Sequence, residues 1–255
     1  VGPITEPNCH PVDNSWHSEQ PTGSTGHAGA RKGIVHVCLN GDIDNYVELK
    51  AELESEFRLE PQDITSDTKI IPLMIESAMQ KGASIDDAFR QTVSAFEGSH
   101  AICMHTSLAP GQLFLARRGS GQALFVGIGA DHYVPSSEVY GVVEETANFI
   151  KIESEPEKGN EAEEDPGRIF ILRPHPDSGL KGIEAEDYSG RPVVVDEAQV
   201  KTTAITSRDI DRQHFSHYFL KEISESPQSV ELTLRNRWNI DAPTGCHQVV
   251  PGEDA

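Results

Sequence analysis

The hydrophobic pattern of the first half of the chain predicts one buried strand followed by three amphipathic helices. Residues 34–39 form a short apolar run that is typical of a buried strand, and Asn40-Gly41 follows it as a turn signal. Apolar positions then recur at helical spacing in three segments. These segments cover residues 46–57, about 68–80 and 85–96.

Capping residues mark the ends of these helices. Asn45 precedes the first helix and Glu48 stands three residues later, which predicts a capping box. Ser84 and Asp87 predict the same arrangement at the start of the third helix. Gly82 is expected to end the second helix.

The second half of the chain changes to the pattern of short strands separated by turns that contain Gly or Pro. We expect strands at 100–106, 112–116, 123–128, 132–135, 169–172 and 192–196. A strand, three helices and then a run of strands favour an α+β fold. We therefore predict two antiparallel sheets packed face to face, with helices outside.

The remaining segments are less regular. Residues 12–32 are predicted to be a surface loop, and the acidic block 153–165 a solvated loop. An amphipathic helix is expected at about 211–226, followed by a short helix after Pro227. The end of the chain, from Asp241, is expected to be irregular.

Composition narrows the class of partner. The net charge of −20 argues against nucleic acid, because binding phosphates requires clustered Lys and Arg. No apolar run is long enough to span a bilayer. Four scattered cysteines without a CxxC pair, and four early histidines (His10, His17, His27 and His36) at separations that fit no ligand spacing, predict no metal site. Reduced thiols in a cytoplasmic protein are the expected state.

Four ordered stretches carry the candidate chemistry. They are GPITEPNCHP at 2–11, LNGDIDNY at 39–46, TSDT at 65–68 and HYFLKEISESP at 217–227. Their order and spacing resemble the glutaminase domain of the glutamine–fructose-6-phosphate aminotransferase family, over roughly residues 1–238. No one stretch is specific, but the ordered set is.

The resemblance implies a layered αββα sandwich of the N-terminal-nucleophile hydrolase type, incomplete at its N-terminus. It divides the chain into a glutaminase domain at 1–200 and a linker helix at 201–255, directed towards a sugar-isomerase domain. The implied activity is hydrolysis of glutamine to supply ammonia to a sugar phosphate, of the fructose-6-phosphate to glucosamine-6-phosphate type. It implies glutamine and the isomerase domain as partners, a homo-oligomer formed through that domain, a cytoplasmic location and no cofactor.

The resemblance also assigns roles to residues. The Asn40 side chain and the Gly41 backbone N–H would stabilise the oxyanion that forms when an N-terminal Cys thiolate attacks the glutamine amide. Asp67 would bind the glutamine α-ammonium group, and Gly2 would lie beside the substrate. Two plainer alternatives remain, in which Asn40-Gly41 is only a turn and Asp67 is only a helix cap. A structural role is expected for His10.

Several positions depart from the family pattern. Val1 stands where the family has His, Leu39 precedes Asn40 where His is usual, and Lys69 replaces a Glu. The nucleophilic Cys would precede this segment, so the chain alone is expected not to hydrolyse glutamine. The competing hypothesis is a non-catalytic amidotransferase-like domain that serves assembly or ligand sensing. If the resemblance holds, Asn40 and Asp67 should line one cleft.

Overall fold

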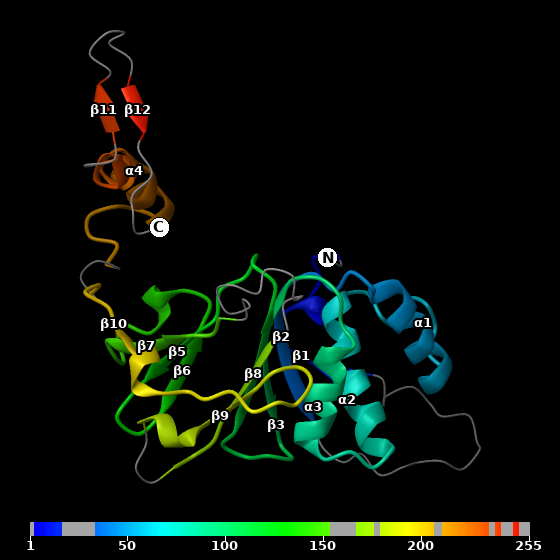
Figure 1. The fold of residues 1–255 in the computed structure, drawn as a ribbon. Helices are drawn as coiled ribbons and strands as arrows, with labels where there is room; N and C mark the ends of the chain where they lie inside the picture. The colour runs from blue at the N-terminus through cyan, green and yellow to red at the C-terminus, as the bar shows by residue number, and fades with distance from the viewer. Residues whose placement is uncertain are drawn as a thin grey trace. The chain divides into compact units, whose positions relative to one another are not determined.

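A computed structural model describes residues 3–16, 34–153, 167–175, 179–206, 211–234, 238–240 and 247–249. The chain forms two compact units, Val1–Ile205 and Thr206–Ala255. Figure 1 shows the elements of each unit. Gly2, most of the 12–32 loop and all of the acidic block 153–165 except Glu153 lie outside the described residues.

The main sheet of the first unit has six antiparallel strands in the order β1-β2-β3-β4-β8-β9. Their bounds are β1 Val12–Asp13, β2 Val35–Gly41, β3 His100–Thr106, β4 Leu113–Arg118, β8 Arg168–Leu172 and β9 Ile183–Glu186. The apolar run at 34–39 and the strand predicted at 100–106 therefore become two neighbouring strands of this sheet. β1 falls inside the segment predicted to be a loop, and it pairs with only two residues of β2.

A second antiparallel sheet of four strands has the order β10-β7-β5-β6. Its strands are β5 Phe125–Ile128, β6 Tyr133–Ser136, β7 Asn148–Lys151 and β10 Lys201–Thr202. An apolar cluster joins the two sheets, with Val126 and Ile150 from the smaller sheet packed among Leu115 and Phe170 of the larger one. The predicted face-to-face packing of two antiparallel sheets is thus confirmed.

Three helices pack on the opposite face of the six-stranded sheet (Figure 1). They are α1 Tyr46–Phe57, α2 Ile70–Gln80 and α3 Ile85–Ser94, and the 3-10 helix η3 Asp67–Lys69 leads into α2. The alternation of β3 divides its side chains between the two cores. Ile102 and Met104 face the helices, whereas Ala101 faces the second sheet.

The α+β fold class is confirmed, with helices, the larger sheet and the smaller sheet as three successive layers. Among the described residues of the first unit, the face of the smaller sheet that points away from the larger one carries no long helix, so the outer helical layer there stays a prediction. Besides η3, the short helices described in this unit are single 3-10 turns. These are η1 Glu6–Asn8, η4 Val139–Gly141, η5 Gly179–Gly182 and η6 Glu197–Gln199.

The two predicted helix caps have different outcomes. Ser84 accepts a hydrogen bond from the Asp87 backbone N–H at 3.1 Å, as its position predicts. Asn45 makes no capping bond. Instead its side chain donates to the Ala95 carbonyl at 2.8 Å and accepts from the Glu97 N–H at 3.1 Å. The capping box with Glu48 was therefore wrong, because a distant segment satisfies the Asn45 amide.

Other strand predictions also need correction. Residues 192–196 form no strand and contribute only an isolated bridge between Pro192 and Glu186. β7 and β9 were not predicted, because each has four residues and a weak apolar pattern.

In the described part of the second unit, α4 Tyr218–Leu234 is the one helix, and it runs through Pro227 rather than ending before it. The strands β11 Trp238–Ile240 and β12 His247–Val249 pair in antiparallel fashion, so the predicted irregular end contains a strand. Within the described residues, no helix is both long and apolar enough to cross a membrane.

Candidate active site

Strand β2 presents two different faces, and Asn40 lies on the polar one. Val35, Val37 and Leu39 are buried against the helices, whereas Cys38 and Asn40 are exposed on the opposite face. The apolar cluster between the two sheets draws its larger-sheet residues from β3, β4, β8 and β9, and none of its members lies on β2. The side chain of Asn40 is therefore accessible from solvent.

Gly41 occupies a backbone conformation that other residues rarely adopt. Its φ is +123°, and an added Cβ would lie 2.2 Å from the Ser99 carbonyl oxygen and 2.9 Å from the His100 Cα. The close passage of β3 therefore requires glycine at this position. The turn predicted at Asn40-Gly41 is a strand end held tightly against its neighbour.

The hydrogen-bond phase of β2 fixes where the Gly41 N–H points. Ser107 N–H donates to the Ile34 carbonyl at 3.1 Å, and Asp42 N–H donates to the Ser99 carbonyl at 3.1 Å. Even-numbered residues of β2 therefore exchange bonds with β3, and odd-numbered residues point the other way. The N–H of Gly41 therefore points away from β3, to the side of β2 on which β1 lies. β1 pairs only with His36 and Val37 and does not extend as far as Gly41. Gly41 thus offers a backbone donor at the residue that follows Asn40.

A loop that we did not assign from the sequence supports this strand end. Gln122 accepts a hydrogen bond from the Ser99 hydroxyl at 2.6 Å, and its Cδ would lie 3.1 Å from a Cβ at Gly41. Gly121 N–H donates to the same hydroxyl at 3.1 Å. Gly119, at φ +80°, lies so close that an added Cβ would be 2.4 Å from Ser99 Oγ. In the sequence, the glycines at 119 and 121 were the signal that could have indicated this loop.

Asp67 begins η3 and does not cap it with its side chain. Ser66 holds the N-cap position, and Asp67 Oδ1 accepts from the adjacent Thr68 N–H at 2.8 Å. No hydrogen bond to Oδ2 is found among the described residues. Burial, and then the nearby Asp67 carboxylate, raise the pKa of the Tyr46 hydroxyl. The Tyr46 hydroxyl donates to the Ile64 carbonyl at 3.3 Å, so a side chain of α1 contacts the segment that leads to Asp67.

The first stretch of the sequence docks on the TSDT segment. Thr65 Oγ1 donates to Asn8 Oδ1 at 2.6 Å, and His10 Nε2 lies 3.0 Å from Thr68 Oγ1. The role expected for His10 was structural, and it holds the neighbour of Asp67, although its ring is exposed rather than buried.

Lys69, one of the departures from the family pattern, is buried on the same segment. Its Nζ donates to Thr65 Oγ1 at 2.9 Å and lies 5.2 Å from the centre of the Trp16 ring. Desolvation lowers the pKa of this ammonium group. Its contacts therefore help to hold the TSDT segment in place.

The structure thus brings three of the four stretches into one region, because η3 packs against β2. A shared cleft between Asn40 and Asp67 stays a prediction. Gly2 lies outside the described residues, and the fourth stretch forms part of α4 in the second unit.

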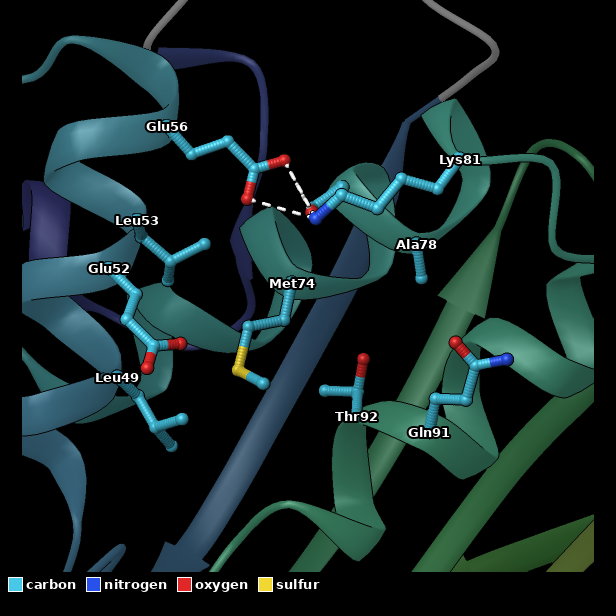
Figure 2. Close-up of a pocket in the computed structure, with 10 residues that line it drawn as sticks. Leu49, Glu52, Leu53, Glu56, Met74, Ala78, Lys81, Gln91 and Thr92 are labelled. Carbon is cyan, nitrogen blue, oxygen red and sulfur yellow. Dashed lines mark hydrogen bonds and ion pairs between the residues drawn. The ribbon is translucent and has the colours of Figure 1, made fainter.

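A hollow on the helical layer is separate from these residues. Figure 2 shows it between α1, α2 and α3, with Leu49, Leu53 and Met74 at its apolar wall. Glu56 and Lys81 form an ion pair at 3.1 Å across its rim. Neither Asn40, Gly41 nor Asp67 lines it. Across the described part of the chain, no group of three or more His, Cys, Asp or Glu side chains is arranged to hold a metal ion.

Comparisons with known proteins show which sequences this chain resembles. A family model described as a glutamine amidotransferase domain matches residues 11–143, just over half of the chain. The chain is 31% identical over 218 residues to glutamine–fructose-6-phosphate aminotransferase (isomerizing) of Methanothermobacter thermautotrophicus, covering 84% of this chain and 32% of that protein. The enzyme of the same name from Sulfolobus acidocaldarius is 27% identical over 234 residues, covering 91% and 33%. The chain spans about a third of the length of these curated relatives.

A solved structure shows the same fold. Glutamine phosphoribosylpyrophosphate amidotransferase from B. subtilis, complexed with ADP and GMP, superimposes with a TM-score of 0.50 at 19% identity. The match covers 74% of this chain and 34% of that one.

Proposed function

The chain belongs to the family of glutamine amidotransferase domains, and from this premise we propose that it is the glutamine-hydrolysing, ammonia-supplying part of an amidotransferase. The fold is α+β and of the N-terminal-nucleophile hydrolase type. The observation that carries the proposal is the end of β2, where the exposed Asn40 is followed directly by Gly41, a glycine at φ +123° packed against the neighbouring strand β3.

Ammonia release from glutamine passes through a tetrahedral oxyanion, and two donors are suited to stabilise it. The Asn40 side-chain N–H and the Gly41 backbone N–H are the donors that we assign to this role. Gly41 is held rigidly by β3, and Gln122 packs against it, so its N–H is oriented before substrate binds. Preorganised donors of this kind favour the transition state because they need no rearrangement.

Asp67 is assigned to the α-ammonium group of glutamine. One of its oxygens is bonded to Thr68 N–H, which fixes the carboxylate, and the other is left for a ligand. The His10–Thr68 bond holds the same segment in place. We also assign Gly2 to the substrate site, on the resemblance of its motif alone.

The acceptor is proposed to be a sugar phosphate of the fructose-6-phosphate type. The curated relatives named above support this, since their names describe that reaction. A sugar-isomerase domain of the same protein would then be the partner, with α4 as part of the connection. We place the protein in the cytoplasm on the same basis.

The test is ammonia release from glutamine by the full-length encoded protein. Asn40→Ala should lower kcat by about 10²–10³-fold, the usual effect of removing one oxyanion donor, and leave KM nearly unchanged. Asp67→Asn should mainly raise KM, because it weakens binding of glutamine. Asn148→Ala and Asp131→Asn change exposed residues of the second sheet region and should leave both constants unchanged.

The outcomes are distinct. An active protein in which Asn40→Ala has no effect on kcat would remove the oxyanion assignment. A full-length protein that binds glutamine but releases no ammonia would favour the non-catalytic domain instead. Formation of an amino sugar phosphate from fructose-6-phosphate tests the acceptor separately, because glutamine hydrolysis alone can persist without it.

A further inference from the structure

Two cysteines face each other across β2 and β3. Cys38 is the register partner of Cys103, and both thiols are free. They lie on the face of the sheet that also carries Asn40, away from the helices. Cys38 is exposed and Cys103 is partly exposed, so small reagents can reach the pair.

The phase of the hydrogen bonds determines the spacing of this pair. Even-numbered residues of β2 exchange bonds with β3, so Cys38 and Cys103 form a hydrogen-bonded pair. The Cα atoms of such pairs are about 5.5 Å apart, within the range of about 4.4–6.8 Å found for disulfides. Their Cβ atoms are about 4.5–5.5 Å apart, whereas a disulfide brings them to about 3.5–4.5 Å. The strands must therefore approach slightly, and the resulting strain makes such a bond easy to reduce.

We propose that Cys38 and Cys103 form a modification site, a reversible cross-strand disulfide made on reaction with a small-molecule disulfide such as oxidised glutathione. The Cys38 thiolate attacks one sulfur of the reagent, and one reduced glutathione leaves. The Cys103 thiolate then attacks Cys38 in this mixed disulfide, and the second glutathione leaves. The protein loses two electrons and two protons, and the reagent takes them up as two thiols.

The environment of each thiol sets the order of these steps. Burial, and then the neighbouring Cys38, raise the pKa of Cys103 to about 11. Burial also raises the pKa of Cys38, which is nevertheless the more exposed of the two. Cys38 therefore reacts first. Once Cys38 is in the mixed disulfide it can no longer carry negative charge, which removes one of the two causes that disfavour the Cys103 thiolate.

The experiment treats the purified 255-residue chain with oxidised glutathione and measures intact mass and tryptic peptides. The wild type should yield a cross-link between the peptides 33–50 and 91–117 that carries no glutathione and weighs two hydrogen atoms less than the two peptides together. Cys103→Ser should instead retain one glutathione on Cys38, because no thiol resolves it. Cys38→Ser should leave Cys103 largely unmodified. The control Cys9→Ser removes an exposed thiol outside the pair and should cross-link as the wild type does.

Two further readouts keep the proposal falsifiable if a serine variant fails to fold. Below the raised pKa values, the cross-linking rate of the wild type should rise about tenfold per pH unit, since the thiolate is the reactive form. Dithiothreitol should restore the original mass. A wild-type product that carries stable glutathione on both cysteines, or a cross-link that joins two chains instead, would overturn the proposal.

Discussion

Gly41→Ala tests whether the end of β2 is held as tightly as its geometry indicates. The substitution places a residue with a side chain at φ +123°, which costs about 1–3 kcal/mol. The new methyl group also meets the Ser99 carbonyl at 2.2 Å and the His100 Cα at 2.9 Å. Both are backbone atoms of the neighbouring strand region, so relief requires the sheet to deform, at a further cost of about 1–3 kcal/mol.

Gly82→Ala is the matched control. Gly82 also has a positive φ, +101°, but a Cβ built there has no heavy atom within 4 Å. It should show only the backbone cost of about 1–3 kcal/mol. The difference between the two variants isolates the collision with β3 and should also be about 1–3 kcal/mol.

Urea unfolding is the appropriate assay, because a change in midpoint at constant slope reports a change in stability. The chain has two tryptophans, so a Trp238→Phe background leaves Trp16, which packs against the helix-side core of the first unit, as the fluorescent reporter. Equal midpoints for Gly41→Ala and Gly82→Ala would refute the argument that β3 enforces glycine at the end of β2.

Two further predictions concern stability. Ser84→Ala should destabilise the first unit by about 1 kcal/mol in the same assay, because it removes the cap of α3, whereas Ser84→Thr should retain most of the stability; equal loss in both would contradict the capping role. Burial alone would raise the pKa of Asp187, but hydrogen bonds from Ser189 and Arg191 outweigh it and hold the pKa below its ordinary value. Its stabilising contribution is therefore present above the unfolded-state pKa and is lost as pH falls through the depressed folded-state pKa. Asp187→Asn should cost about 1–3 kcal/mol at neutral pH and progressively less in acid, as urea unfolding at several pH values would show; a cost independent of pH would contradict this.

The elements that were predicted correctly have strong local patterns. β3 has one fully buried face, which includes Ile102 and Met104, and α3 carries both an apolar stripe and a true cap. The errors arise where contacts between residues that are far apart in the sequence determine the local structure. The capping box at Asn45 matched its local pattern, yet Ala95 and Glu97 engage that side chain.

The candidate site shows the same division. Asn40, Gly41 and Asp67 were identified from motifs, and β2 and η3 place them in adjoining elements. Ser99 and Gln122 were missed, because their importance comes from packing against Gly41 and not from a residue type associated with chemistry. Contacts between a loop and a strand end that are far apart in sequence leave little trace in a local pattern.

The alternation along β2 separates two kinds of selective constraint within a single strand. Val35, Val37 and Leu39 are buried, so selection should act on substitutions there through their effect on the folding of the domain. Cys38 and Asn40 contribute no side chain to that core and are open to change without loss of the fold. A lineage can therefore alter reactivity on one face of this strand while the other face keeps the domain intact. Neighbouring positions in the sequence are then expected to evolve at different rates and for different reasons.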